Sequence, residues 1–306
     1  MLKFHTMDVF TETAYLGNPL AIVLGADALG TDQMQTIARE FNLSETIFVQ
    51  RPKNLAHTAK VRIFLPTAEI PFAGHPTIGC AILLAEAAMG DGDSECQIVL
   101  EEEAGVVPVH VRRQSGRITA ELTAPVVPFR HDGPQNPRAL SPDLLALALC
   151  LRSDEIGLPD HKPGLWQGGS AFLYVPLRDL GALKSARPAE PYWSEVLQAG
   201  GVTSAYLYTI GAAGVDYQAR MISAKNSFSE DPATGSASAI LAAQLWASGA
   251  VGQGETWLSL LQGVEMGRRS EIGLTIRCNA SGVQEVRVRG SAVRISDGQI
   301  RVPATT

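Results

Sequence analysis

Two segments that are apolar on nearly every face constrain the fold of this chain more than any other feature. The runs TIGCAILLAEAAMG from Thr77 and SASAILAAQLWASG from Ser236 have the composition of helices but lack a polar stripe. A helix on a protein surface keeps one polar face, so helices of this kind are buried on every side. Short strand-like runs dominate the rest of the chain. We therefore predict an α+β protein in which a mostly antiparallel β-shell or barrel surrounds each central buried helix.

The remaining periodic segments predict the strands and the other helices. Amphipathic helical patterns begin at Thr31, Ser141 and Tyr192, and Thr31 is the expected N-cap of the first. Many of the strand-like runs alternate apolar and polar residues, as half-buried antiparallel strands do. They begin at Ala21, Thr46, Ala59, Gln97, Val106, Arg117, Ala171, Ser204, Tyr217, Gly273, Glu285 and Gly298.

The two apolar helices also indicate an internal duplication. Each follows a strand-like run and a Gly-containing step, FAGHPT at 72–77 and PATGSA at 232–237. The repeat is too long for a solenoid, so it indicates a duplicated domain. A Pro-rich stretch at 124–137 is the natural linker. We predict two pseudo-symmetric domains, 1–126 and 127–291, with the active site in the cleft between them; a C-terminal strand at about 292–306 can join the first domain.

Composition excludes several classes of partner. The net charge is −6 and no block of Lys and Arg stands out, which argues against nucleic acid and against an anionic membrane. No apolar run is long enough to span a bilayer, and the N-terminus lacks the pattern of a signal peptide. The four cysteines are scattered without a CxxC pair, as in reduced proteins, so we expect a cytoplasmic protein. Histidines never occur at metal-ligand spacing, and no cofactor or metal is expected.

The N-termini of the two buried helices are candidate anion sites. The first N–H groups of a helix have no partner within it, and the helix dipole adds positive potential there. Gly74 and Gly235 allow a ligand to approach the backbone closely. If the two halves face each other, both helix N-termini point into one cleft. That arrangement suits a small carboxylate-bearing substrate.

Three side chains near these termini could move a proton: His75, Asp231 and Glu45. A carboxylate in a dry cleft can take a proton from carbon and return it, and an imidazole can do the same or hold the substrate. Structural roles are also open. An Asp before Pro232 can be a helix cap or a turn residue, and a lone His in an apolar context can be a packing residue.

Five blocks in order along the chain carry a resemblance to a known family. They are DVFTETAYLGNPLAIV (8–23), FNLSETIFV (41–49), IFLPTAEIPFAGHPTIG (63–79), EDPATGSA (230–237) and QGVEMGRRSEI (262–272). Together they resemble the phenazine-biosynthesis PhzF-like family, whose fold is similar to that of diaminopimelate epimerase. The resemblance implies two similar domains, each a β-shell around a central helix, with the active site between them. It also implies a homodimer.

The resemblance implies roles for individual residues. Glu45 matches the general acid/base, and His75 and Asp231 match its partners in the cleft. Positions that hold the substrate are matched by Gly74, Gly235 and Ser236. The related epimerases carry a cysteine just before each of these glycines, where this chain has Ala73 and Thr234. A two-thiol racemisation is therefore not available, whereas one acid/base working on one face is.

The expected function is a cofactor-independent isomerase that moves a proton on a small carboxylate-bearing substrate. A dehydratase or lyase acting on the same kind of substrate stays open, as does a non-catalytic binding protein on this fold. The chain departs from the family pattern in SAKNSFS, where Lys225 and Asn226 replace a more apolar loop and could alter the choice of substrate.

Overall fold

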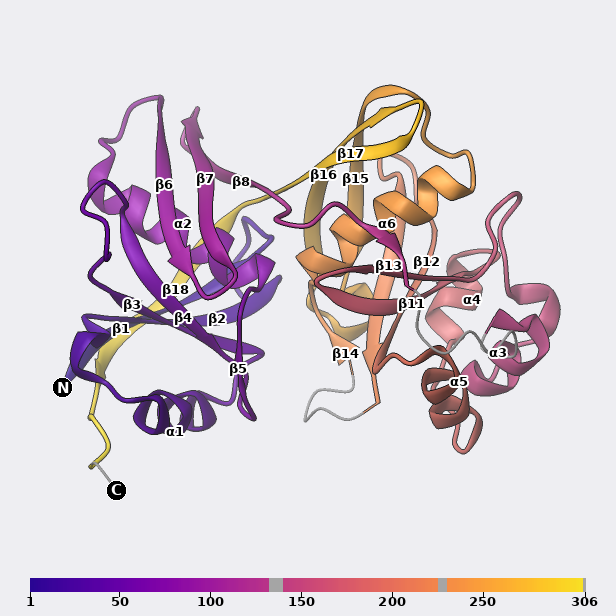
Figure 1. Ribbon diagram of the computed structural model, residues 1–306, viewed down its shortest axis with the longest axis horizontal. Helices are drawn as coiled ribbons and strands as arrows, with labels where there is room; N and C mark the ends of the chain where they lie inside the picture. The colour runs from indigo at the N-terminus through magenta and orange to yellow at the C-terminus, as the bar shows by residue number, and fades with distance from the viewer. Residues whose placement is uncertain (132–139, 225–229, 305–306) are drawn as a thin grey trace. The chain divides into compact units, whose positions relative to one another are not determined.

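The computed structural model describes residues 1–131, 140–224 and 230–304 (Figure 1). The chain divides into two compact units. The first comprises Met1–Pro125 and Val288–Thr306, and the second comprises Val126–Arg287. Lys225 and Asn226 lie outside the described residues, and so does the part of the Pro-rich stretch from residue 132 onward. No helix in the described ranges is long and apolar enough to cross a membrane.

The first unit is a curved sheet around one helix. Its strands are β1 (Leu2–Val9), β2 (Asn18–Leu24), β3 (Glu45–Gln50), β4 (Ala59–Phe64), β5 (Glu69–Ile70), β6 (Ser94–Glu102), β7 (Gly105–Gln114), β8 (Arg117–Thr123) and β18 (Ala292–Ile300). They pair in the order β18–β1–β2–β3–β4–β6–β7–β8, with β5 on β4. The pairs β2–β3 and β4–β6 are parallel, and the others are antiparallel.

Helix α2 (Gly74–Ala88) is the buried axis of this unit. It contacts β1, β2, β3, β6, β7, β8 and β18, and its first ten residues are all buried. Figure 1 shows it among these strands. The prediction of a helix without a polar stripe is therefore confirmed. The helix begins three residues earlier than the apolar run indicates, because Gly74, His75 and Pro76 form its first turn.

A second helix of this unit, α1 (Thr31–Phe41), covers a small cluster of apolar side chains. Met34, Ile37 and Ala38 pack there with Phe48 of β3 and Phe64 of β4. The expectation that Thr31 is its N-cap is wrong. Gly30 holds that position, and its backbone N–H donates to Oε1 of Gln33 at 3.0 Å, which leaves Thr31 as the first helical residue.

The second unit contains the remaining strands and helices. Its strands are β9 (Phe129–Arg130), β10 (Gly164–Gly168), β11 (Ser170–Pro176), β12 (Ser204–Ile210), β13 (Tyr217–Ser223), β14 (Glu230–Asp231), β15 (Gly254–Gln262), β16 (Ser270–Asn279) and β17 (Gly282–Gly290), the last of which ends in the first unit. Pairing runs β9–β10–β11–β12–β13–β15–β16, with β14 on β13. Helix α6 (Gly235–Ala247) contacts β9, β10, β11 and β16 and is buried over most of its length.

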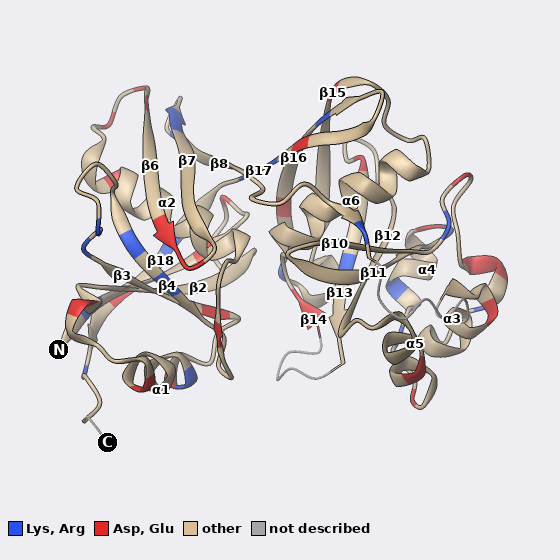
Figure 2. Cartoon of the chain, in the orientation of Figure 1, with Lys and Arg blue, Asp and Glu red and all other residues tan. Residues whose placement is uncertain are grey.

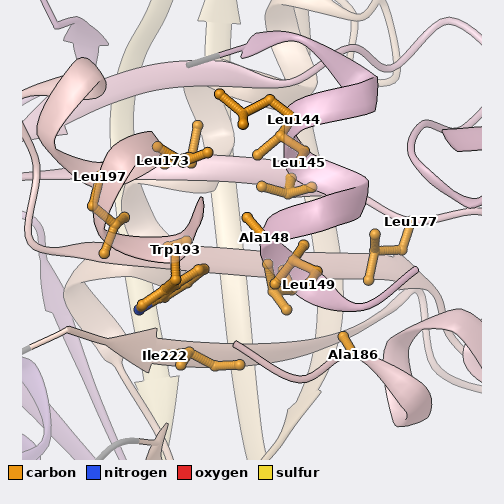
Figure 3. Close-up of a cluster of buried hydrophobic side chains, with 14 of the residues drawn as sticks. Leu144, Leu145, Ala148, Leu149, Leu173, Leu177, Ala186, Trp193, Leu197 and Ile222 are labelled. Carbon is orange, nitrogen blue, oxygen red and sulfur yellow. The ribbon is translucent and has the colours of Figure 1, made fainter. Parts of the chain in front are cut away.

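Three more helices, α3 (Pro142–Leu149), α4 (Leu180–Ser185) and α5 (Tyr192–Gly200), cover the other side of this sheet. Figure 3 shows Leu144, Leu145 and Leu149 of α3 meeting Trp193 and Leu197 of α5 above the strands. The spacing of these residues places them on one face of each helix, so burying them fastens both helices to β11, β12 and β13.

The same pairing pattern recurs in both units. A parallel pair (β2–β3, β11–β12) is followed by an antiparallel strand (β4, β13), a two-residue strand (β5, β14) and the buried helix. The strand after the helix (β6, β15) then lies parallel to that antiparallel strand.

The register of the pairing lets individual residues be matched between the units. Phe64 pairs with Glu69 in the first unit, and Ile222 pairs with Glu230 in the second. Ala59 pairs with Leu100, and Tyr217 pairs with Leu260. Counting from these pairs matches Arg62 with Arg220, Glu69 with Glu230, Gly74 with Gly235, Glu102 with Gln262 and Glu45 with Ser204.

Candidate active site

Three polar side chains meet in the first unit where β2, β3 and α2 begin. Glu45 is the first residue of β3, and His75 is the second residue of α2. Nε2 of His75 lies 3.3 Å from Oε2 of Glu45. On the other side of the ring, the amide nitrogen of Asn18, the first residue of β2, lies 3.4 Å from Nδ1 of His75. Parallel pairing of β2 with β3 brings Asn18 and Glu45 to the same end of the sheet.

The environment of His75 fixes its charge. The side chain is 4% exposed, and burial lowers its pKa from 6.5 to about 3, so the ring is neutral near pH 7. A neutral imidazole has one N–H donor and one acceptor nitrogen. Because the Asn18 amide donates to Nδ1, the proton of the ring lies on Nε2, the nitrogen nearer Glu45.

The first turn of α2 supplies backbone donors beside these side chains. The first intrahelical bond runs from the Thr77 N–H to the Ala73 carbonyl at 3.3 Å. The N–H groups of Gly74 and His75 precede it and have no partner inside the helix, and Pro76 has no N–H. Two donors therefore remain at the N-terminus of α2, next to the Glu45 and His75 side chains.

In the second unit Asp231 belongs to a network at the start of α6. The Thr234 hydroxyl donates to Oδ2 of Asp231. The amide nitrogen of Gln262, a fully buried side chain, donates to the Asp231 carbonyl at 2.8 Å and to the Thr234 hydroxyl oxygen at 3.1 Å. The Gln262 amide oxygen accepts from the Thr234 N–H at 3.2 Å. One amide thus holds both ends of the turn from Asp231 to Thr234.

Gly263 allows a close backbone contact beside this turn. It has φ of 73°, and a Cβ there would lie 2.7 Å from the Pro232 carbonyl oxygen. A side chain at this position would push the turn away, so the residue after Gln262 needs to be glycine.

Helix α6 begins as α2 does. Gly235 is its first residue, and its first intrahelical bond runs from the Ser238 N–H to the Thr234 carbonyl at 2.9 Å. The N–H groups of Gly235, Ser236 and Ala237 therefore have no partner within the helix. Thr234 is the N-cap residue, so Asp231 does not occupy the cap position.

The structure brings Glu45 and His75 together within the first unit, and Asp231, Gly235 and Ser236 together within the second. Sequence reasoning missed Asn18 and Gln262, although both lie in the blocks that carried the resemblance. The available signal was the same in each case: a polar residue at the end of an apolar strand, in NPLAIV and in LSLLQ. The catalytic and binding roles remain predictions.

Within the described residues, no three His, Cys, Asp or Glu side chains are grouped so that they could hold a metal ion. Acidic residues do gather at β14, where Glu230 and Asp231 are adjacent (Figure 2). Glu230, however, is bound in a bidentate ion pair to Arg220, with both nitrogen–oxygen distances 2.8 Å.

Comparison with known proteins gives matches over the whole chain. A family model described as phenazine biosynthesis-like protein matches residues 7–298. An uncharacterized isomerase of Mesorhizobium japonicum is 39% identical over 96% of each chain. The trans-2,3-dihydro-3-hydroxyanthranilate isomerase of Pseudomonas aeruginosa is 30% identical over 98% of this chain and 99% of its own.

Solved structures agree on the fold. A phenazine biosynthesis protein of the PhzF family from Bacillus anthracis superposes with a TM-score of 0.84 at 21% identity, covering 98% of this chain and 99% of its own. A probable proline racemase from Agrobacterium radiobacter superposes with a TM-score of 0.65 at 15% identity, covering 99% and 94%.

These findings define an isomerase on the mixed α+β fold that is shared with proline racemase. The family model extends over nearly the whole length. The chain belongs to the family of phenazine biosynthesis-like proteins, as the five sequence blocks predicted.

Proposed function

We propose that this isomerase works without a cofactor and moves a proton on a small carboxylate-bearing substrate by general acid/base catalysis. Glu45 takes the proton from carbon and returns it at another position. His75 and Asp231 position the substrate or relay the proton. Backbone N–H groups at Gly74 and Gly235, together with Ser236, hold the substrate carboxylate and offset charge that develops during the reaction.

The contact between Glu45 and His75 is the observation that carries this proposal. A carboxyl group 3.3 Å from a buried, neutral imidazole has a hydrogen-bond donor beside it rather than a fixed positive charge. A hydrogen bond from a neutral donor weakens a carboxylate base less than a permanent cation does. This environment suits a carboxylate that must both accept and release a proton.

The comparison of the two units favours a mechanism with a single base. The residue that matches Glu45 in the second unit is Ser204, and the residue that matches His75 is Ser236. Neither serine can act as a second general base at neutral pH without activation. We therefore favour a mechanism in which Glu45 alone moves the proton. The alternative, in which two matched groups remove the proton from one face of the substrate and return it to the other face, fits less well.

The names of relatives narrow the substrate class. The P. aeruginosa relative is a trans-2,3-dihydro-3-hydroxyanthranilate isomerase, and a P. chlororaphis relative with the same name is 32% identical. A dihydroanthranilate is a cyclic, unsaturated amino acid with one carboxylate. We propose that the substrate of this chain is a ring compound of that kind, because backbone donors at a helix N-terminus suit a carboxylate.

Solvent-deuterium incorporation tests the proposal directly. The protein is incubated in D₂O with trans-2,3-dihydro-3-hydroxyanthranilate and a panel of related cyclic carboxylic acids, and the products are analysed by mass spectrometry and NMR. We expect Glu45→Gln to slow incorporation by about a hundredfold or more, the usual contribution of a general acid/base. Glu40→Gln, which removes an exposed carboxylate from the same unit, should incorporate deuterium at the wild-type rate.

Incorporation by Glu45→Gln at the wild-type rate would refute the assignment of the base. Product mass separates the alternatives, since an isomerase conserves the mass of its substrate in H₂O whereas a dehydratase releases water.

A further inference from the structure

Glu102 is a buried carboxyl that the proposed reaction does not use. It is the last residue of β6, is 8% exposed and contacts α2 through the Thr77 side chain. Oε1 of Glu102 lies 2.7 Å from Oγ1 of Thr77, and Oγ1 of Thr77 lies 2.7 Å from the Ala73 carbonyl oxygen. The three oxygens form a chain that ends at the N-cap residue of α2.

Counting protons along this chain determines the state of Glu102. The Ala73 carbonyl can only accept a hydrogen bond, so its contact with Thr77 uses the single hydroxyl proton of Thr77. The contact between Thr77 and Glu102 then needs a second proton, because two oxygens 2.7 Å apart without one repel each other. Of these three groups, only the Glu102 carboxyl can supply that second proton.

The matched residue of the second unit supports the same conclusion. Register places Gln262 where Glu102 lies, and Gln262 uses a neutral amide to hold Asp231 and Thr234 at the start of α6. A protonated carboxylic acid has nearly the shape of an amide and also has one donor and one acceptor side. Both units thus place a neutral planar group beneath the N-terminus of the buried helix.

Among the residues that the structure describes, no cation is placed to stabilise an ionised Glu102. Its face of the sheet is lined by apolar residues of β4, β6 and β7: Ala59, Val61, Ile63, Ile98, Leu100, Val107 and Val109. On α2 the titratable groups are Cys80, whose pKa is raised by burial and then by Glu102, His75, which is neutral, and Glu86, which lies near the end of the helix and pairs with Arg294. Glu101 on the opposite face binds His57. Burial raises the pKa of Glu102 to about 7.

We propose that Glu102 is a protonated carboxylic acid in the folded protein and a positioning residue that, through Thr77, fixes the peptide at which α2 begins. That peptide joins the Ala73 carbonyl to the Gly74 N–H. Because a peptide unit is planar, holding the carbonyl also sets the direction of the N–H. The inference rests on the proposed function in one respect, namely that the Gly74 N–H donates a hydrogen bond to the substrate. An ionised Glu102 would also weaken binding of a substrate carboxylate at this helix N-terminus.

The state of Glu102 can be measured without a substrate. We compare full-length wild type with Glu102→Gln, and use Glu103→Gln, which changes an exposed neighbour, as the matched control. Infrared spectra should contain the C=O band of a protonated carboxylic acid in wild type and Glu103→Gln near neutral pH, and Glu102→Gln should lack it. The urea midpoint of wild type, followed by far-UV circular dichroism, should fall relative to that of Glu102→Gln as pH rises from about 4.5 to about 7. His75 is common to both proteins, so its titration cancels in this comparison.

The positioning role is measured by the kinetics of deuterium exchange, with an acid of the panel that the wild-type protein exchanges. At mildly acidic pH, Glu102→Gln should keep the wild-type rate, whereas Glu102→Ala should lose about tenfold, as expected for one misplaced hydrogen bond. Above neutral pH the KM of wild type should rise while that of Glu102→Gln stays constant.

Two results would overturn the proposal: the same infrared band in wild type and Glu102→Gln, or a loss of exchange in Glu102→Gln as large as that in Glu102→Ala. Should no acid in the panel exchange, the proposed function fails, and the infrared and unfolding results still decide the state of Glu102.

Discussion

The matched ion pairs Arg220–Glu230 and Arg62–Glu69 allow a quantitative test of how the second unit holds Asp231. Arg220 of β13 binds both oxygens of Glu230, the neighbour of Asp231 in β14. Its remaining nitrogen, Nη1, donates to the carbonyls of Leu183 and Ala186 at the end of α4, at 2.8 and 2.9 Å. Burial alone would lower the pKa of Arg220, but its interactions with Glu230 leave that pKa raised. One side chain therefore joins β13, β14 and α4.

Arg220→Ala removes every one of these bonds and leaves a carboxylate and two carbonyls without their donor. The Arg220 and Glu230 side chains are 6% and 15% exposed, so water cannot fully replace the lost guanidinium. Breaking a buried pair from one side costs about 3–5 kcal/mol of unfolding free energy. The Arg62 and Glu69 side chains are 16% and 26% exposed. Arg62→Ala should therefore cost about 1–2 kcal/mol, as partly solvated charged hydrogen bonds do.

Tryptophan fluorescence makes the assay specific to one unit. The four tryptophans, Trp166, Trp193, Trp246 and Trp257, all belong to the second unit. Urea unfolding followed by fluorescence therefore reports on Arg220→Ala, and far-UV circular dichroism reports on Arg62→Ala as well. Equal losses for the two variants, or a loss below about 1 kcal/mol for Arg220→Ala, would show that burial does not set the strength of these pairs.

Three further measurements test other parts of the structure. Asn18→Leu removes the amide that keeps the His75 proton on Nε2, so exchange should slow by about tenfold or more while the circular dichroism spectrum stays unchanged; an unaltered rate would exclude a role for this tautomer. Gly79→Ala places a Cβ 2.7 Å from Leu20 and 2.8 Å from Val9 and should destabilise the first unit by about 1–3 kcal/mol, whereas Gly90→Ala meets nothing within 4 Å and should be neutral. For Glu102 the folded pKa of about 7 lies above its ordinary 4.5, so the folded state binds the extra proton and stability falls as pH rises between these values. The difference of about 2.5 pH units corresponds to about 3 kcal/mol, which Glu102→Gln should abolish in urea titrations.

The buried helices could be predicted from sequence because their composition leaves no surface face. Their first residues could not, since Gly74 and His75 have weak helix propensity and Pro76, although tolerated in a first turn, does not require one. Thr31 was expected to be the N-cap residue of α1 because of its hydroxyl, but Gly30 occupies that position and its N–H donates to the Gln33 side chain. Local propensity ranks residues for a position and does not choose between adjacent positions that are nearly equivalent.

The candidate site, like the helices, could be predicted only in part from the sequence. Glu45 and His75 could be selected by their motifs, but their contact depends on parallel pairing of β2 with β3 and on the position of α2 beneath that edge. No local pattern encodes a pairing between residues thirty positions apart in sequence. Asn18 and Gln262 escaped notice for a related reason, because a polar residue at a strand end is usually solvated and only tertiary structure shows that these two are fully buried.

Matching the two units residue by residue distinguishes side chains that stabilise the fold in both units from side chains that are present in only one. The arginine–glutamate pair is the same in both, Arg62–Glu69 and Arg220–Glu230, as expected for a device that fastens a short strand to its neighbour. Glu45 is replaced by Ser204 and His75 by Ser236, so the pair of a carboxylate and an imidazole is present in the first unit only. Glu102 and Gln262 differ in kind but agree in shape and, on our inference, in charge. The matched positions of the two units hold an acid and its amide, which have the same shape and charge when the acid is protonated, so Glu102→Gln tests our inference most directly.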